Sequence, residues 1–241
     1  MTRNTAKARP VVGLVAAAGS ASRFGPAEGA PKQFLDLAGE PVLVRSVRAL
    51  LACRTVSRVL CAVAGEWLDR ASAIIEDAGL GATVRLVEGG GTRQESVRRL
   101  LDAASDPEPP DVVLIHDAAR PFVPADIVEA AIEAARRSGA AVVAAPTTDT
   151  VAAHRGGFLD RVLNRTELVN IQTPQAFRFD LIRDAHARAL DDGLLDATDD
   201  SVLVLRLGHR VAVVPGPATN IKITTPLDLE LARLLLRDAG R

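Results

Sequence analysis

An arginine and a lysine stand in a loop of small residues, a combination that could bind a phosphate-containing ligand. Arg23 and Lys32 follow three alanines and Gly19 in the stretch AAAGSASRFGPAEGAPKQF (16–34). Small side chains let backbone N–H groups approach an anion closely, and the two cations would neutralise its charge. The stretch matches neither G-x-G-x-x-G nor G-x-x-x-x-G-K-S/T, which argues against a dinucleotide-dependent dehydrogenase and a P-loop enzyme. A flexible loop with solvated charges is the alternative interpretation.

A second loop, EGGGTRQESV (88–97), places three glycines before a predicted helix. Gly89–Gly91 allow backbone conformations that are closed to other residues, and Thr92 could cap a helix that starts near Arg93. Ser96 lies one helical turn further on and would face the same cleft as the glycines. An ordinary strand–helix turn is the alternative interpretation of this loop.

An aspartate follows a predicted buried strand in the stretch HDAARPF (116–122). Mg²⁺ commonly takes one or two carboxylates and fills its remaining positions with water and phosphate oxygens, so Asp117 is a candidate ligand. A helix cap or an ion pair with Arg120 is the alternative for Asp117. His116 has no second His or Cys at ligand spacing, so we interpret it as a structural residue or as one that supports a neighbouring site residue.

Lysine is rare in this chain and stands at informative positions. Only Lys7, Lys32 and Lys222 occur among 29 basic residues, and the remainder are arginines. Lys222 lies in GPATNIKITTP (216–226), where a short strand is predicted, so its side chain would point away from the face that Ile221 and Ile223 bury. A solvated edge-strand lysine is the alternative.

Composition restricts the class of protein. The chain has 241 residues, a net charge of −1, 3% aromatic residues and no Tyr, which argues against nucleic-acid binding. No apolar run approaches the ~20 residues of a membrane span. Cys53 and Cys61 lie in apolar runs and indicate buried thiols in a reducing, cytoplasmic compartment. The run VVGLVAAA (11–18) has some features of a signal peptide, but it leads directly into the glycine loop, which favours a first core strand.

Apolar runs of strand length alternate with amphipathic segments along the chain, a pattern that predicts one α/β domain over 1–241. The predicted strands are 11–17, 58–64, 83–87, 111–116, 140–146 and 210–215. The predicted helices are 42–53, 67–78, 93–104, 125–138, 179–191 and 226–240. Because the strands are apolar on both faces, we expect a mostly parallel sheet covered by helices on both sides.

Residues 149–173 interrupt this alternation. They contain a Gly156-Gly157 turn between short mixed segments, which predicts a β-arm leaving the main sheet. Its apolar residues, among them Phe158 and Leu159, need a partner surface, so the arm is a candidate dimerisation element.

The order of these blocks resembles the 2-C-methyl-D-erythritol 4-phosphate cytidylyltransferase family. The matching blocks are AAAGSASRFG, PKQF, GGGTRQESV, HDAARPF, NRTELVNIQTPQAF and TNIKIT, and the resemblance runs from residue 11 to about residue 236. It implies a Rossmann-like nucleotidyltransferase fold, with a mostly parallel twisted sheet, and a homodimer with exchanged arms. The implied reaction joins CTP and methylerythritol 4-phosphate, with Mg²⁺, into CDP-methylerythritol and pyrophosphate in the non-mevalonate isoprenoid pathway.

The resemblance also implies roles for individual residues. Those that would hold CTP are Ala17, Ala18, Gly19, Gly90, Arg93, Ser96 and Ala118. Arg23 and Lys32 would bind the triphosphate and stabilise the transition state, and Asp117 would hold Mg²⁺. Those that would hold the sugar phosphate are Arg120, Thr150, Arg165, Thr173 and Lys222, some of them from the partner subunit. Arg165 and Lys222 would also act in catalysis.

The chain departs from the family pattern at three places. Ala16 stands where the family usually has Pro, and Ala21 where it has Gly. The segment from Arg23 to Lys32 is longer than usual, which leaves its register open. Thr219 replaces a common acidic residue, so Asp117 would be the only protein ligand to the metal.

Two other functions fit part of the same pattern. A ribitol 5-phosphate cytidylyltransferase would use the same motifs on another polyol phosphate. A non-catalytic nucleotide-binding protein would not need cations at the reacting phosphates. Asp199 and Asp200 form an acidic pair before an apolar segment, and we interpret them as helix-start residues and not as metal ligands.

Overall fold

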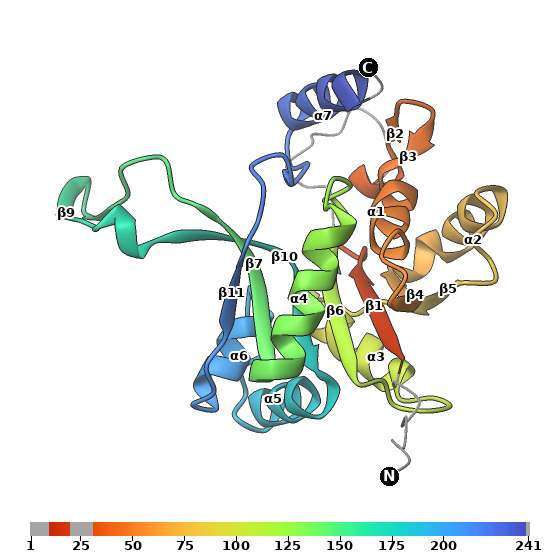
Figure 1. Ribbon diagram of the computed structural model, residues 1–241, viewed down its shortest axis with the longest axis horizontal. Helices are drawn as coiled ribbons and strands as arrows, with labels where there is room; N and C mark the ends of the chain where they lie inside the picture. The colour runs from red at the N-terminus through yellow and green to blue at the C-terminus, as the bar shows by residue number, and fades with distance from the viewer. Residues whose placement is uncertain (1–9, 20–30, 240–241) are drawn as a thin grey trace, which may run out of the picture.

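A seven-stranded sheet forms the centre of the protein (Figure 1). The computed structural model describes residues 10–19 and 31–239. The strands of this sheet are β1 (Val11–Ala16), β4 (Val56–Val63), β5 (Val84–Glu88), β6 (Val112–Asp117), β7 (Ala140–Pro146), β10 (Val169–Arg178) and β11 (Ala212–Pro215). Their order across the sheet is β11-β7-β10-β6-β1-β4-β5.

One strand of the sheet, β10, runs against the others. It pairs antiparallel with β6 on one side and with β7 on the other, whereas the remaining pairs are parallel. The predicted mostly parallel sheet is therefore confirmed, and all six predicted strands are present. The seventh strand was not predicted, because the arm was expected to extend to residue 173.

Helices cover both faces of the sheet, as expected. They are α1 (Val42–Leu51), α2 (Leu68–Asp77), α3 (Arg93–Ala104), α4 (Ala125–Ser138), α5 (Phe179–Asp191), α6 (Asp200–Arg206) and α7 (Pro226–Ala239). One core cluster joins α1, α2 and α4 to one face, and a second joins α3, α5 and α6 to the other. A third, smaller cluster packs α7 against the hairpin of β2 (Asp36–Leu37) and β3 (Glu40–Pro41).

The alternation of side chains along β1 explains how one strand serves both layers. Val11 and Val15 belong to the cluster with α1, whereas Val12 and Leu14 belong to the cluster with α3. All four side chains are fully buried. Gly13 lies between them, and a Cβ there would sit 3.1 Å from side-chain atoms of Leu50 and of the β4 strand, so the close approach of α1 favours glycine.

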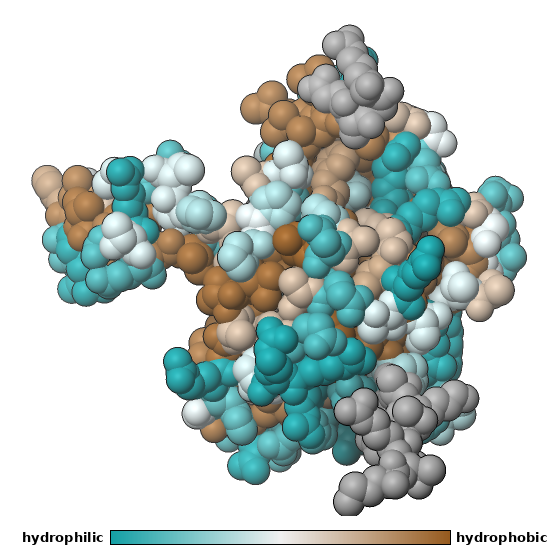
Figure 2. Space-filling view, in the orientation of Figure 1, coloured by the Kyte–Doolittle hydropathy of each residue, from teal (hydrophilic) through white to brown (hydrophobic). Residues whose placement is uncertain are grey.

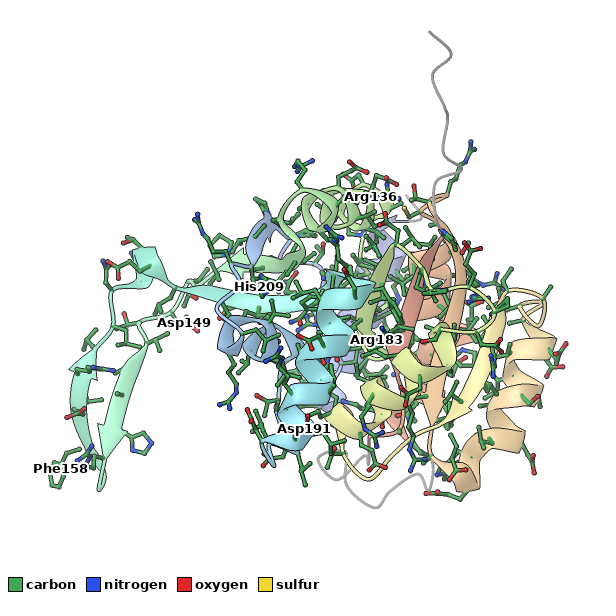
Figure 3. The ribbon with its side chains drawn as sticks, turned by 90° about the horizontal axis from the view of Figure 1, so that it is seen from below. Arg136, Asp149, Phe158, Arg183, Asp191 and His209 are labelled. Carbon is green, nitrogen blue, oxygen red and sulfur yellow. The ribbon has the colours of Figure 1, made fainter. Side chains whose placement is uncertain are left out.

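The predicted arm is present and stands away from the sheet (Figure 1). Its strands β8 (Ala152–Arg155) and β9 (Phe158–Val162) pair antiparallel, and Gly156 and Gly157 form the turn with φ of 57° and 86°. These positive φ values favour glycine. Figure 3 places Phe158 at the far end of the arm and Asp149 near its base.

The order of the strands creates a ligand-binding position at the carboxyl ends of the neighbouring strands β1 and β6. From β1 the chain adds β4 and β5 on one side, then crosses to place β6 on the other side of β1. The loops that leave the carboxyl ends of β1 and β6 therefore diverge, and open α/β sheets bind their ligands at such a switch point.

Candidate active site

A cleft of about 450 Å³ opens at this switch point. Its volume lies within the range of small-molecule sites. The lining residues come from the loops after β1, β5 and β6 and from the segment before α7. They are Ala16, Ala17, Ala18, Gly19, Lys32, Gln33, Gly90, Gly91, Thr92, Arg93, Ser96, Asp117, Ala118, Ala119 and Lys222.

The loop after β1 presents backbone to the cleft. Gln33 is buried and donates from Nε2 to the carbonyl of Ala17 at 2.6 Å, while the Ala17 N–H bonds to the β4 strand. A Cβ added to Gly19 would meet no described atom within 4 Å. Gly19 lines the cleft, so its lack of a side chain leaves room there as far as the described residues are concerned.

The glycine loop after β5 is held by the first turn of α3. Thr92 caps the helix, since its Oγ1 accepts from the N–H of Glu95 at 3.1 Å. Ser96 Oγ accepts from the N–H of Gly90 at 3.0 Å, and Glu95 accepts from the N–H of Gly91 at 2.8 Å. The predicted cap at Thr92 is therefore confirmed, and these side chains fix the glycine backbone beside the cleft.

Three cations surround Asp117, the last residue of β6. Its Oδ2 lies 2.7 Å from Lys222 Nζ and 3.8 Å from Arg120 Nε, and its Oδ1 lies 3.5 Å from Arg93 Nε. Burial would raise the pKa of Asp117, but the charges of Arg93, Lys222 and Arg120 hold it well below its usual range. Asp117 is therefore ionised at neutral pH. The ion pair with Arg120 agrees with the alternative interpretation of Asp117.

A chain of hydrogen bonds fixes the end of β6. The Asp117 N–H donates to Thr173 Oγ1 at 3.0 Å, and this hydroxyl lies 3.0 Å from His116 Nδ1. His116 Nε2 lies 2.9 Å from the Arg120 carbonyl, which can only accept, so Nε2 donates and Nδ1 accepts from Thr173. Burial lowers the pKa of His116 to about 4. His116 is thus neutral and structural, as expected.

Lys222 reaches the cleft from an extended segment. The predicted short strand is not formed there, because none of the described strands pairs with residues 220–224. Asn220 instead fastens the segment to β10, donating to Gln172 Oε1 at 3.0 Å and to the Thr173 carbonyl at 2.9 Å. Ile221 and Ile223 pack in the α7 cluster, so the alternation still turns Lys222 toward the cleft.

Lys32 connects the first and last loops of the site. It begins the short helix η1 (Lys32–Phe34), and its Nζ donates to the carbonyl of Ile223 at 3.0 Å. The two lysines therefore enter the cleft from segments that are joined to each other.

The structure places the predicted site residues in three groups. Ten of them line the cleft: Ala17, Ala18, Gly19, Lys32, Gly90, Arg93, Ser96, Asp117, Ala118 and Lys222. Arg120 and Thr173 lie directly behind Asp117. Thr150 and Arg165 are exposed at the arm and do not line the cleft of their own chain. Arg23 lies outside the described residues.

Sequence reasoning missed a second buried carboxylate behind the cleft. Asp199 caps α6 by accepting from the N–H of Ser201 at 2.9 Å, as expected of a helix-start residue. Asp200, however, is 1% exposed and forms an ion pair with Arg93 at 2.6 Å. The sequence did offer one signal: a single acid is enough to cap a helix, so the second acid of the pair, Asp200, was free for another role. Its partner lies 107 residues away, so local patterns could not identify it.

The described residues contain no group of three or more His, Cys, Asp or Glu that could hold a metal ion by themselves. Among the described residues that line the cleft, Asp117 is the one with a carboxylate. This donor set fits an ion such as Mg²⁺ that takes most of its ligands from water and phosphate oxygens. In the described part of the chain, no helix combines the length and the apolar character needed to cross a membrane.

Comparisons with known proteins agree with this geometry. Residues 11–238 match the model of the family described as 2-C-methyl-D-erythritol 4-phosphate cytidylyltransferase. A relative of that name from Thermus thermophilus is 45% identical, covering 93% of this chain and 96% of the relative. One from Acidobacterium capsulatum is 43% identical over 86% of this chain and 87% of its own length.

A solved structure is similar over nearly the whole fold. It is the 4-diphosphocytidyl-2C-methyl-D-erythritol synthase of Anaerococcus prevotii, with a TM-score of 0.82 and 29% identity. The similarity covers 95% of this chain and 96% of that chain. The expected Rossmann-like nucleotidyltransferase architecture is therefore confirmed.

Proposed function

This chain belongs to the 2-C-methyl-D-erythritol 4-phosphate cytidylyltransferase family, and on that premise we propose that it joins CTP and methylerythritol 4-phosphate in the non-mevalonate isoprenoid pathway. The products are CDP-methylerythritol and pyrophosphate. The observation that supports this proposal most strongly is the cleft at the switch point, where bare backbone on two loops faces Lys32, Arg93 and Lys222.

The backbone-lined part of the cleft would hold the nucleotide. Ala17, Ala18 and Gly19 lie on one side, and Gly90 and Ser96 lie on the other. Arg93 and Ala118 complete this set. Loops with so few side chains let a nucleotide lie close to the backbone, and Arg93 adds a charged donor for phosphate oxygens.

The transfer requires no protein nucleophile. A phosphate oxygen of methylerythritol 4-phosphate attacks the α-phosphorus of CTP in line; the bond from that phosphorus to the bridging oxygen breaks, and pyrophosphate leaves with the electron pair. Phosphate oxygens are ionised at neutral pH, so catalysis consists of bringing two anions together and stabilising charge on the leaving group.

The two lysines suit the two sides of this reaction. Lys32, together with Arg23, would bind the triphosphate and stabilise the departing pyrophosphate. Lys222, together with Arg165, would hold the attacking phosphate. Lys222 stands 2.7 Å from Asp117, lines the cleft and is 39% exposed at its side chain, which supports contact with an incoming anion.

Asp117 is the residue that would hold Mg²⁺. When bound, the ion would neutralise charge on the triphosphate and orient it. Within the protein, the three cations keep Asp117 ionised and hence able to act as a ligand. Thr219 offers no carboxylate, so the other ligands would be phosphate oxygens and water.

The arm would complete the site of a second subunit in a homodimer. Phe158, Leu159 and Val162 are 79%, 75% and 62% exposed, a set of apolar side chains that favours burial against a partner. Thr150 and Arg165 stand on this arm, away from their own cleft. Exchange of arms would bring them to the sugar phosphate beside Arg120, Thr173 and Lys222. Figure 2 shows the apolar surface of the arm next to polar groups.

Both substrates are small phosphates dissolved in water, and the chain's net charge of −1 offers no general attraction for nucleic acid or an anionic membrane. A cytoplasmic location fits these properties and the two buried free thiols, Cys53 and Cys61.

Pyrophosphate release tests the proposal. The enzyme is assayed with CTP and Mg²⁺ in the presence of methylerythritol 4-phosphate, of ribitol 5-phosphate, or of no acceptor, with an EDTA-treated sample for each. We expect release only with methylerythritol 4-phosphate and its loss after chelation. Preference for ribitol 5-phosphate would refute the proposed acceptor. No release with either acceptor would favour a nucleotide-binding protein without catalysis.

A further inference from the structure

A buried ionic network behind the cleft reaches it through one arginine. Arg93 Nη1 lies 2.6 Å from Asp200 Oδ2, and Arg93 Nε lies 3.5 Å from Asp117 Oδ1. The second oxygen of Asp200, Oδ1, lies 3.0 Å from His186 Nε2. Arg93 therefore joins the carboxylate in the cleft to a carboxylate that solvent does not reach.

Asp200 is not needed as a helix cap. Asp199 already accepts from the N–H of Ser201 at the start of α6. Burial would raise the pKa of Asp200, but Arg93 and the hydrogen bond from His186 lower it below its usual range. A buried ion pair often contributes little net stability compared with apolar residues in the same space. A role for Asp200 in orienting Arg93 explains the pair better than a role in stability.

Hydrogen bonds fasten the segment before Asp200 to the first turn of α3. Gln94 donates from Nε2 to the Leu194 carbonyl at 2.7 Å, and its Oε1 accepts from the N–H of Ala197 at 2.7 Å. Thr92 Oγ1 donates to the Leu195 carbonyl at 3.2 Å. These contacts flank Arg93 along the chain, so the start of α6 and the start of α3 are held as one unit.

The geometry of Arg93 suits a donor that is held in place for a ligand. Nε and Nη1 face the two carboxylates, whereas Nη2 makes no hydrogen bond within the described part of the chain. The side chain lines the cleft. A guanidinium is planar, so fixing two of its nitrogens also fixes the direction of the third.

We propose that Asp200, supported by His186, is a positioning residue that orients the Arg93 guanidinium toward the nucleotide in the cleft. The inference rests on the proposed function for the identity of that nucleotide, CTP. Asp200 itself touches neither substrate and acts only through Arg93.

The test compares CTP binding by calorimetry in a double-mutant cycle of Asp200→Asn and Arg93→Gln. We expect Asp200→Asn to weaken binding about tenfold, the order of one charge-assisted hydrogen bond. In the Arg93→Gln background, Asp200→Asn should have no further effect on binding. Equal effects in both backgrounds, or no effect in either, would overturn the proposal. The matched control is Asp192→Asn, which removes a surface partner of Arg206 on the same layer.

A second measurement reads the orientation of Arg93 without any ligand. Exchange of the Arg93 Nε–H with solvent, followed by NMR, should be slow in the parent protein and as fast as in a surface arginine after Asp200→Asn. Unchanged exchange would refute the positioning role. A parent protein that fails to bind CTP would refute the proposed function, while the exchange measurement still decides the role of Asp200. If Asp200→Asn does not fold, as judged by circular dichroism, His186→Gln replaces it, with the same direction expected.

Discussion

Replacing Lys222 by alanine is expected to stop turnover while leaving the fold intact. Lys222 lies 2.7 Å from Asp117 at the cleft, where we propose that it holds the attacking phosphate. Arg93 and Arg120 lie 3.5 Å and 3.8 Å from Asp117 in the parent protein, so we expect them to compensate its charge in the variant. Because Lys222 is also 39% exposed at its side chain, its loss should change the free energy of unfolding by about 1 kcal/mol or less.

The effect on catalysis should be much larger than the effect on stability. Removing a single donor aimed at charge that develops in a transition state costs about 3–4 kcal/mol, or roughly 10²–10³ in kcat. The affinity for CTP should change little, because Lys222 acts on the other substrate. Lys222→Arg should also lose most of the activity, since a planar guanidinium does not replace a compact ammonium group at a reacting phosphate.

Steady-state pyrophosphate release, CTP calorimetry and thermal unfolding together test this reasoning. Arg206→Ala is the matched control, because it removes a cation whose ion pair with Asp192 is on the surface, and we expect it to keep parental turnover. Near-normal kcat in Lys222→Ala would refute the assigned role. A large loss of thermal stability would show that the lysine supports the fold through Asp117 instead.

Three further predictions address other parts of the molecule. Lys32→Ala should lower pyrophosphate release by about 10²–10³ without unfolding the protein; near-parental release would contradict its role on the leaving group. The double variant Phe158→Ser/Leu159→Ser should shift the enzyme from dimer to monomer in analytical ultracentrifugation, because it removes the apolar surface of the arm; an unchanged mass would contradict the exchanged-arm dimer. Asp200 has a folded-state pKa below its unfolded value of about 4, so its stabilisation is present above that pH and is lost as the pH falls. The free energy of unfolding in urea, measured from about pH 3 to about pH 7, should therefore fall less at acidic pH in Asp200→Asn than in the parent protein. An equal fall in both would count against this linkage.

Most strands and helices could be predicted because their residues follow a recognisable local pattern of apolar side chains and of prolines and glycines at the ends. A strand such as β1 is apolar on both faces, and helices such as α4 begin after a proline and end at a glycine. Gly139 ends α4 with φ of 89°, which is the expected use of glycine at a helix end. Such signals are local, so they survive without knowledge of the tertiary structure.

The strand β10 escaped prediction because several of its buried residues are polar. Gln172, Thr173 and Gln175 are 7%, 5% and 0% exposed and bind partners that lie far away in sequence. Thr173 bonds to the end of β6, Gln172 to Asn220, and Gln175 to Asp199. The sequence pattern of β10 resembles that of a loop, because the partners that satisfy its polar side chains are brought together only in the folded protein.

The two kinds of cation at and behind the cleft, arginine and lysine, differ in how firmly the protein holds them. Arg93 is fixed between two carboxylates, and Arg120 is half-buried and donates to the Asn220 carbonyl at 2.7 Å. Lys222 instead pairs with Asp117 and leaves 39% of its side chain exposed. With Lys32, the described part of the site holds four cations, whereas the carboxylates whose charges act on Arg93 are three: Asp117, Asp199 and Asp200.

This local excess of positive charge stands in a chain whose net charge is −1. Two phosphate substrates that repel each other are therefore attracted to one place on the protein and not to its surface in general. In the proposed reaction the fixed arginines would define where a phosphate lies, because their donors cannot follow a misplaced ligand. The lysines would shift by rotation about their flexible stems as charge moves from the attacking to the leaving oxygen. Scarcity of lysine elsewhere in the chain is thus consistent with a requirement for this residue type at Lys32 and Lys222 that arginine does not meet.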